Sequence, residues 1–82
     1  MENEIVLFAY PNPTHEILNV KISRLHEMAQ SELYDNSGRQ LISTGEWKGE
    51  STIDMSGLSK GMYILKVKTV GGVVVNKIVK DE

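Results

Sequence analysis

The sequence predicts an all-β domain, an immunoglobulin-like antiparallel β-sandwich of about seven strands. Three observations predict it: apolar and polar residues alternate with a period of two, turn residues recur roughly every 8–12 positions, and no long stretch has helical periodicity. The chain has 82 residues, of which 40% are hydrophobic and 24% are charged, a composition typical of one small globular domain. A small open barrel is the structural alternative.

The first two strands are separated by a proline-rich turn. Residues 5–10 form the first strand, which ends at Pro11-Asn12-Pro13, because proline fixes φ and has no N–H to donate to a ladder. Residues 17–23 then alternate apolar and polar side chains, the pattern of a half-buried strand.

A loop and a hairpin follow. Residues 23–30 are interpreted as a loop, since the helical spacing within them is too short to be stable without packing. Residues 29–34 and 39–44 are predicted strands, joined by the Asp-Asn-Ser-Gly turn at 35–38. Residues 45–50 are predicted to form another loop or turn, which carries the single tryptophan.

The last third of the chain has the clearest pattern. Residues 51–55 form a short strand, and residues 61–70 form a longer, central one. Gly71-Gly72 predicts a two-residue hairpin turn, because both residues can adopt the positive φ of a primed turn. Residues 73–80 return beside the central strand.

Composition excludes several classes of protein. The chain has 9 Lys+Arg against 11 Asp+Glu and a formal net charge of −2, a balance that argues against nucleic-acid binding, which is driven largely by clustered Lys and Arg. It contains no cysteine, which excludes disulfides, thiolate zinc sites and cysteine nucleophiles. Its longest apolar stretch, residues 5–10, is far shorter than the roughly 20 residues of a membrane helix.

No targeting signal is recognised in the sequence. The first four residues are acidic, whereas a secretory signal begins with a basic segment followed by an apolar one. If the chain is exported, we expect its export signal to lie upstream and to have been removed.

Residues capable of catalysis do not form a pattern. His15 and His26 are interpreted as surface histidines, because neither belongs to a pair at metal-ligand spacing. The acidic pairs at the two chain ends are interpreted as solvated side chains. No nucleophile elbow or phosphate-binding glycine loop is present. We therefore expect no enzyme activity, no bound metal ion and no cofactor.

Four groups of residues occur in a recognisable order. They are Tyr10-Pro11-Asn12-Pro13-Thr14, Leu33-Tyr34-Asp35 with Gly38-Arg39, Leu58 with Gly61-Met62-Tyr63-Ile64-Leu65-Lys66-Val67, and Lys77-Ile78-Val79-Lys80. Together they resemble the C-terminal sorting domain of the type IX (Por) secretion system, type A, from Tyr10 to Lys80.

The resemblance implies a non-catalytic domain at the C-terminus of a cargo protein in a Gram-negative bacterium. Such a domain is read by the type IX translocon, and a sortase-like signal peptidase usually removes it. The cargo passes through the periplasm and ends at the cell surface or outside the cell. Residues 1–9 would then be a linker and first strand region after a missing cargo domain, and residues 10–82 the sorting domain.

The resemblance also assigns roles to residues. It implies structural roles for Pro11, Asn12 and Pro13, which would form a rigid turn that opens the domain, and for three further residues. These are Gly38, Gly61, which would supply a tight turn into the strand, and Tyr63, which would be a packed ring with a bonded hydroxyl.

Recognition by the secretion machinery is assigned to the end of the chain, at Lys77, Ile78, Val79 and Lys80. Ile78 and Lys80 would face one side and Lys77 and Val79 the other, so an accessible last strand would present lysines while its backbone pairs with a receptor. The alternative is that these lysines only protect a sheet edge from aggregation. Asp81 and Glu82, which follow the terminal lysine, depart from the family pattern.

Two other functions are weighed. One is an accessory sandwich that binds a carbohydrate or a protein on a face containing Trp47, although core packing is the commoner fate of such a residue. A small hydrolase ranks last, because no acid and base converge in the sequence. Exposed strand edges would also allow self-association.

Overall fold

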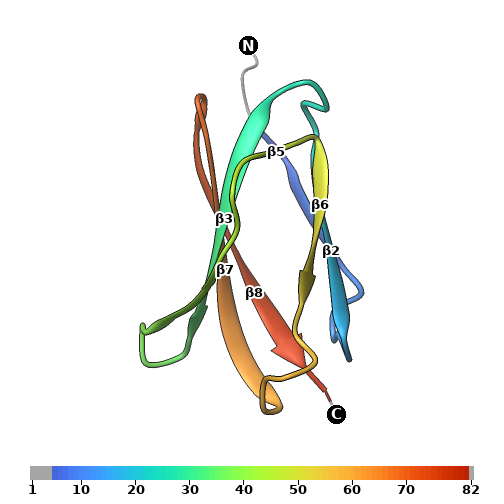
Figure 1. Ribbon diagram of the computed structural model, residues 1–82, viewed down its shortest axis with the longest axis vertical. Helices are drawn as coiled ribbons and strands as arrows, with labels where there is room; N and C mark the ends of the chain where they lie inside the picture. Colours follow the sequence, from blue (N-terminus) through green and yellow to red (C-terminus); the bar gives the residue numbers. More distant parts are fainter. Residues whose placement is uncertain (1–4, 82) are drawn as a thin grey trace.

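The computed structural model describes residues 5–81, which form eight strands in two antiparallel sheets packed face to face (Figure 1). One sheet has the order β1-β2-β6, and the other has the order β4-β3-β7-β8 with β5 also paired to β3. The strands are β1 (Leu7–Tyr10), β2 (Ile17–Ile22), β3 (Met28–Asp35), β4 (Gln40–Ser43), β5 (Trp47–Lys48), β6 (Glu50–Asp54), β7 (Gly61–Thr69) and β8 (Gly72–Lys80). The predicted all-β sandwich is confirmed, and the two sheets do not close into a barrel.

The additional strand is β5, which lies where the sequence predicts a loop. It is only two residues long and pairs with the start of β3, with Trp47 opposite Ala29. A strand of two residues is too short to show the alternation of apolar and polar residues from which a strand is predicted. Gly49, which follows, has φ +77°, and a Cβ on it would lie 2.5 Å from the main-chain oxygen of Leu25. Only glycine fits this approach.

The turn between β7 and β8 is displaced by one residue from its predicted position. Thr69 pairs with Gly72, so the turn residues are Val70 and Gly71 rather than Gly71 and Gly72. Of the two predicted turn glycines, only Gly72 has a positive φ, +142°. The Thr69 hydroxyl accepts a hydrogen bond from the Gly71 N–H at 3.0 Å, which stabilises the observed turn.

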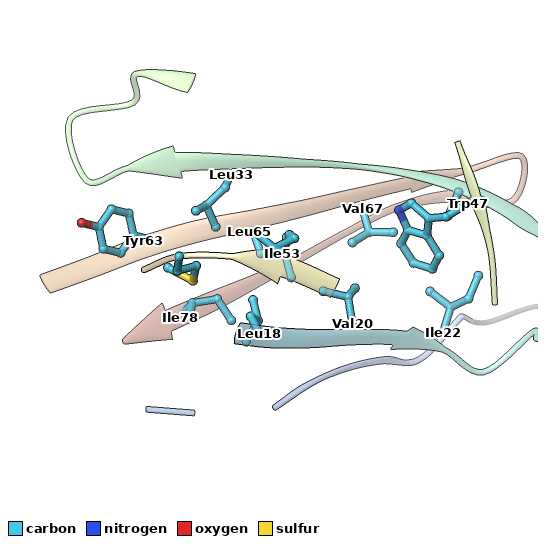
Figure 2. Packing of buried hydrophobic residues seen from close by; sticks show 12 residues of the cluster. Leu18, Val20, Ile22, Leu33, Trp47, Ile53, Tyr63, Leu65, Val67 and Ile78 are labelled. Atoms are coloured by element: carbon cyan, nitrogen blue, oxygen red, sulfur yellow. The ribbon is translucent and has the colours of Figure 1, made fainter. Parts of the chain in front are cut away.

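A single hydrophobic core fills the space between the sheets (Figure 2). Each fully buried aliphatic side chain in it contributes about 1.5–3 kcal/mol relative to exposure. The buried hydrophobic residues are Leu18, Val20, Ile22, Ala29, Leu33, Trp47, Ile53, Met55, Tyr63, Leu65, Val67 and Ile78.

Trp47 belongs to this core rather than to a surface. Its ring lies beside Ile22 and Val67 (Figure 2), and the residue is 8% exposed. Its indole N–H donates to the hydroxyl of buried Ser31 at 2.9 Å, which satisfies the one polar atom of the ring. Trp47 is therefore a core residue in this sandwich and not an exposed aromatic platform.

Candidate functional site

The last strand, β8, is the edge of its sheet. It pairs with β7 on one side along its whole length, from Thr69 opposite Gly72 to Gly61 opposite Lys80. Its C-terminal end lies at the opposite end of the long axis from the β7–β8 turn (Figure 1). An edge strand has a row of N–H and C=O groups directed away from the sheet, so the partners of these groups decide what β8 can bind.

Asn12 covers part of this edge with its side chain. The amide Nδ2 donates to the carbonyl oxygen of Lys77 at 3.0 Å, and the amide Oδ1 accepts from the N–H of Val79 at 3.0 Å. A side-chain amide has one donor group and one acceptor, so here it replaces the main chain of a neighbouring strand.

Thr14 continues the same cover with its main chain. Its N–H donates to the carbonyl of Val79, and its carbonyl accepts from the N–H of Asp81, both at 2.8 Å. Thr14 and Lys80 thereby form a parallel bridge. The Thr14 side chain is buried, and its hydroxyl donates to the carbonyl of Ile17 at 3.2 Å.

The proline-rich segment therefore both turns the chain and hydrogen-bonds to the C-terminal part of β8. Pro11 and Pro13, whose preceding peptide bonds are both cis, lie on either side of Asn12 between β1 and β2. The predicted turn is present, but it lies inside the sandwich, after a first strand that pairs fully with β2, and it bonds to the other end of the chain. The sequence offered no sign of this contact, because prolines break the alternation on which strand pairing is predicted.

Lys77, Ile78, Val79 and Lys80 alternate in direction. Lys77 and Val79 are exposed on the outer face of the sheet, whereas Ile78 is fully buried and Lys80 is only 7% exposed. The expectation that the strand presents both lysines is therefore wrong for Lys80. Lysine tolerates such burial because its aliphatic stem can be buried while its ammonium reaches the surface.

The outer face of β7 and β8 combines apolar and cationic side chains. The register places eight side chains together on it: Met62, Ile64, Lys66 and Lys68 from β7, and Val73, Val75, Lys77 and Val79 from β8. Four of these residues, Met62, Val73, Val75 and Val79, are large hydrophobics that stay exposed. This set of eight is called the β7–β8 outer face below.

A polar network on β3 borders this face. The Tyr34 hydroxyl donates to the Glu32 carboxylate at 2.6 Å, and the Lys68 ammonium lies 3.1 Å from the same carboxylate. The hydrogen bond from Tyr34 and then that from Lys68 lower the pKa of Glu32, and the bond to Glu32 raises the pKa of Tyr34. Lys66 lies 5.6 Å from the centre of the Tyr34 ring, a cation–π distance.

Gly38 lies in a tight turn built by Asp35. The Asp35 carboxylate accepts from the N–H and hydroxyl of Ser37 and from the N–H of Arg39, at 2.7–3.0 Å. These bonds, that of the Ser37 hydroxyl above all, lower the pKa of Asp35. Gly38 has φ +91°, a conformation that favours glycine.

Tyr63 is packed in the core, and its hydroxyl is hydrogen-bonded. The hydroxyl donates to the main-chain carbonyl of Ser59, four residues earlier. A tyrosine near the start of a strand that bonds back in this way is the tyrosine corner of immunoglobulin-like domains. Gly61, with φ +152°, begins the strand two residues before it.

The histidines and acids do not gather into a metal centre in the part of the chain that the structure describes. His15 is exposed, with its Nδ1 3.4 Å from the carbonyl oxygen of Asp81, and His26 is exposed in a loop. Between residues 5 and 81, no group of three or more His, Asp or Glu side chains is placed to hold a metal ion. Glu2, Glu4 and Glu82 lie outside the described residues.

Among residues 5–81, no helix is long and apolar enough to cross a membrane.

The fold and the covered edge define an immunoglobulin-like domain with its last strand at a sheet edge and its beginning bonded to its end. The family model for the secretion system C-terminal sorting domain matches residues 8–81. The chain belongs to this family. A comparison with curated proteins finds no match.

Membership gives the domain a function. Domains of this family are C-terminal sorting signals for secretion, and they interact with the type IX secretion machinery. They direct export across the outer membrane to the cell surface or the extracellular space. The family is generally non-catalytic.

Proposed function

We propose that this chain is a type A sorting domain that directs an upstream cargo through the periplasm and the type IX translocon, and that a sortase-like peptidase then removes it. The observation that carries the proposal is that the family match extends to residue 81, through the whole of β8. The domain takes no part in catalysis and binds no cofactor.

Recognition in this proposal involves the last strand. Lys77 and Val79 contact the machinery, because their side chains are exposed on the outer face. Ile78 and Lys80 act indirectly, since they fix the strand by packing inward. The edge position of β8 supports this division of roles.

The test is export of a fluorescent reporter. The reporter carries an N-terminal periplasmic signal and is followed by residues 1–82, in a host with a working type IX system. We expect the intact fusion to reach the surface or the medium without the domain, so the exported product is shorter than the periplasmic precursor. Retention of the intact fusion in the periplasm would overturn the proposal.

Point variants separate recognition from folding. We expect Lys77→Ala to accumulate in the periplasm as a folded protein, and Lys80→Ala to lower both stability and export. The matched control is Lys48→Ala, which removes an exposed lysine from β5 on the far side of the same sheet. Export of Lys77→Ala at the level of Lys48→Ala would show that the lysine only protects the edge.

A further inference from the structure

The outer edge of β8 is divided into a covered half and an open half. Every hydrogen bond between residues 12 and 14 and the main chain of residues 77–81 involves an odd-numbered residue, Lys77, Val79 or Asp81. Since main-chain groups alternate in direction along a strand, the odd-numbered residues direct their N–H and C=O away from β7. Val73 and Val75 therefore direct theirs outward too.

The outward groups of Val73 and Val75 have no hydrogen-bond partner among residues 5–81. Each valine is also 55% exposed. Asn12 and Thr14 hydrogen-bond only to residues 77–81, so the edge from residue 72 to residue 76 is open in the sense that its outward main-chain groups are unpaired, although β1 also lies close to β8.

This open half also lacks the features that protect other sheet edges. Residues 72–76 contain no charge, no proline and no register shift. By contrast, β6 carries Glu50 and Asp54, β1 ends at Pro11 after four residues, and β4 is four residues long with a shift in its pairing. An unprotected edge on the longest edge strand of this sandwich is suited to pairing with another strand.

The side chains beside the open edge favour an acidic partner. Lys66, Lys68 and Lys77 lie on the β7–β8 outer face, and Glu32, the acid next to them, is already bonded to Tyr34 and Lys68. This face is cationic although the whole chain has a net charge of −2. A hollow of about 400 Å³ whose lining includes Tyr34, Ile64, Lys66 and Val75 adjoins the edge and can hold an apolar side chain. Asp35 also lines this hollow, but its carboxylate is already bonded to Ser37 and Arg39.

We infer that the open edge at residues 72–76 is where an extended acidic segment of the secretion machinery adds to the sheet as a further strand. Its main chain bonds the outward groups of Val73 and Val75, a carboxylate lies near Lys66 and Lys77, and an apolar side chain enters the hollow. The inference rests on the proposed function and moves the main contact upstream of residues 77–80. A second copy of this chain fits less well, because edge-to-edge pairing would bring two cationic faces together.

The first test removes one outward N–H group. Val75→Pro deletes the donor that an added strand needs but leaves the β7 ladder intact, because proline is tolerated where an edge N–H faces solvent. The matched control is Thr52→Pro on the edge of β6, where odd-numbered residues bond β2 and the N–H of Thr52 faces outward. We expect export of the reporter fusion to fall about tenfold or more for Val75→Pro, through loss of main-chain bonds and steric exclusion, and to be unchanged for Thr52→Pro.

The second test reverses charge and does not depend on how Val75→Pro folds. Lys66→Glu with Lys77→Glu should lower export severalfold, whereas Lys48→Glu with Lys60→Glu, which changes net charge equally, should not. The purified chains are compared by circular dichroism melting and by sedimentation.

The outcomes distinguish the two proposals. If the unmodified fusion stays in the periplasm, the sorting function itself fails. If it is exported and both the Val75→Pro chain and the charge-reversed chain are exported equally well, the acidic strand is overturned while the sorting function stands. A dimer that Val75→Pro abolishes, together with normal export of the charge-reversed chain, would assign the edge to a second copy and also overturn the inference. Loss of export in both chains, with their melting unchanged, supports an acidic strand at this edge, whereas loss in the charge-reversed chain alone, with Val75→Pro folded and exported normally, would overturn the added strand.

Discussion

At the scale of single residues, Asn12 links the two ends of the chain through hydrogen bonds as long in range as those of Thr14. Its amide bonds main-chain groups that lie 65 and 67 residues away in the sequence. It is exposed and has no charge, so its contribution is hydrogen bonding across the seam between the two sheets. Asn12 bonds the covered half of the edge and not the open half. A substitution of Asn12 should therefore change the stability of β8 without removing the groups proposed to bind the secretion machinery.

We predict that Asn12→Ala lowers the free energy of unfolding by about 1–3 kcal/mol, the usual cost of losing two hydrogen bonds at a partly exposed site. Asn12→Asp should lose less, since a carboxylate can still accept from the Val79 N–H but cannot donate to the Lys77 carbonyl. Urea unfolding gives the energies, and hydrogen exchange should accelerate at Val79 before it does at Val67. Asn36→Ala, in an exposed turn, is the control. Equal stability of Asn12→Ala and Asn36→Ala would contradict the prediction.

Tyr63 is a second residue whose hydrogen bond should contribute measurably to stability. We predict that Tyr63→Phe destabilises the domain by about 0.5–1.5 kcal/mol, because the ring stays packed while the Ser59 carbonyl loses its donor. Thermal melting of the two proteins measures this difference. An unchanged melting temperature would mean that water replaces the hydroxyl at no cost.

Glu32 should respond to Tyr34 in its titration. The pKa of Glu32 is lowered from 4.5, first by the Tyr34 hydroxyl and then by Lys68. A carboxylate with a lowered folded-state pKa stabilises the fold above its unfolded pKa, and that contribution is lost as pH falls through the folded value. Tyr34→Phe should therefore raise the pKa of Glu32 and shrink this acid-dependent part of stability. Carboxyl-carbon NMR titration measures the change; an identical Glu32 curve in Tyr34→Phe would refute it.

At the scale of elements, prediction from the sequence was most accurate where one strand carries a long alternating pattern. The predicted strand at residues 61–70 is observed as β7, and the predicted strand at 17–23 is observed as β2. β5 could not be predicted, because two residues have no period. The predicted β7–β8 turn is one residue away from the observed one. A glycine pair shows that a turn can form nearby, but it does not show that the Thr69 hydroxyl will bond the Gly71 N–H and so stabilise the turn one position earlier.

The candidate site was predictable only in part, for the same physical reason. Alternation alone places Ile78 and Lys80 on one face, but it does not say that this face is the core, and so the burial of Lys80 was missed. The cover from residues 12 and 14 depends on a contact between distant parts of the chain. The open edge at Val73 and Val75 becomes visible only once that cover is known.

The β8 strand is also necessary for the fold. A chain that ends at Gly72 loses Ile78 from the core and leaves β7 paired with β3 on one side only. Removing one buried aliphatic side chain costs about 2–5 kcal/mol, a large part of the 5–15 kcal/mol that holds a small domain together. We predict that this shortened chain is unfolded by circular dichroism. A folded spectrum would show instead that the other seven strands form a stable domain without β8.

At the scale of the whole molecule, the two ends of the described chain have different surroundings. The chain extends 38 Å along its long axis, and the C-terminal end of β8 lies at one end of it (Figure 1). At the other end, the Ile5 side chain lies 3.1 Å from where a Cβ on Gly71 would be, so the start of the described chain touches the β7–β8 turn. In the proposed function, a cargo joined upstream of Ile5 would therefore enter the domain near the β7–β8 turn, next to the open edge at Val73 and Val75.

This arrangement makes export depend on the connection to the cargo. A bulky reporter joined directly before Ile5 should crowd the open edge and lower export severalfold. A flexible Gly/Ser linker of about 16 residues, with a mean reach of roughly 20–24 Å, should restore export because it lets the reporter move away from the β7–β8 turn. The two fusions should melt at the same temperature, since neither alters a contact within residues 5–81. Equal export of both would mean that the machinery approaches β8 from its C-terminal end, where Lys77 and Val79 would then be the first residues it meets.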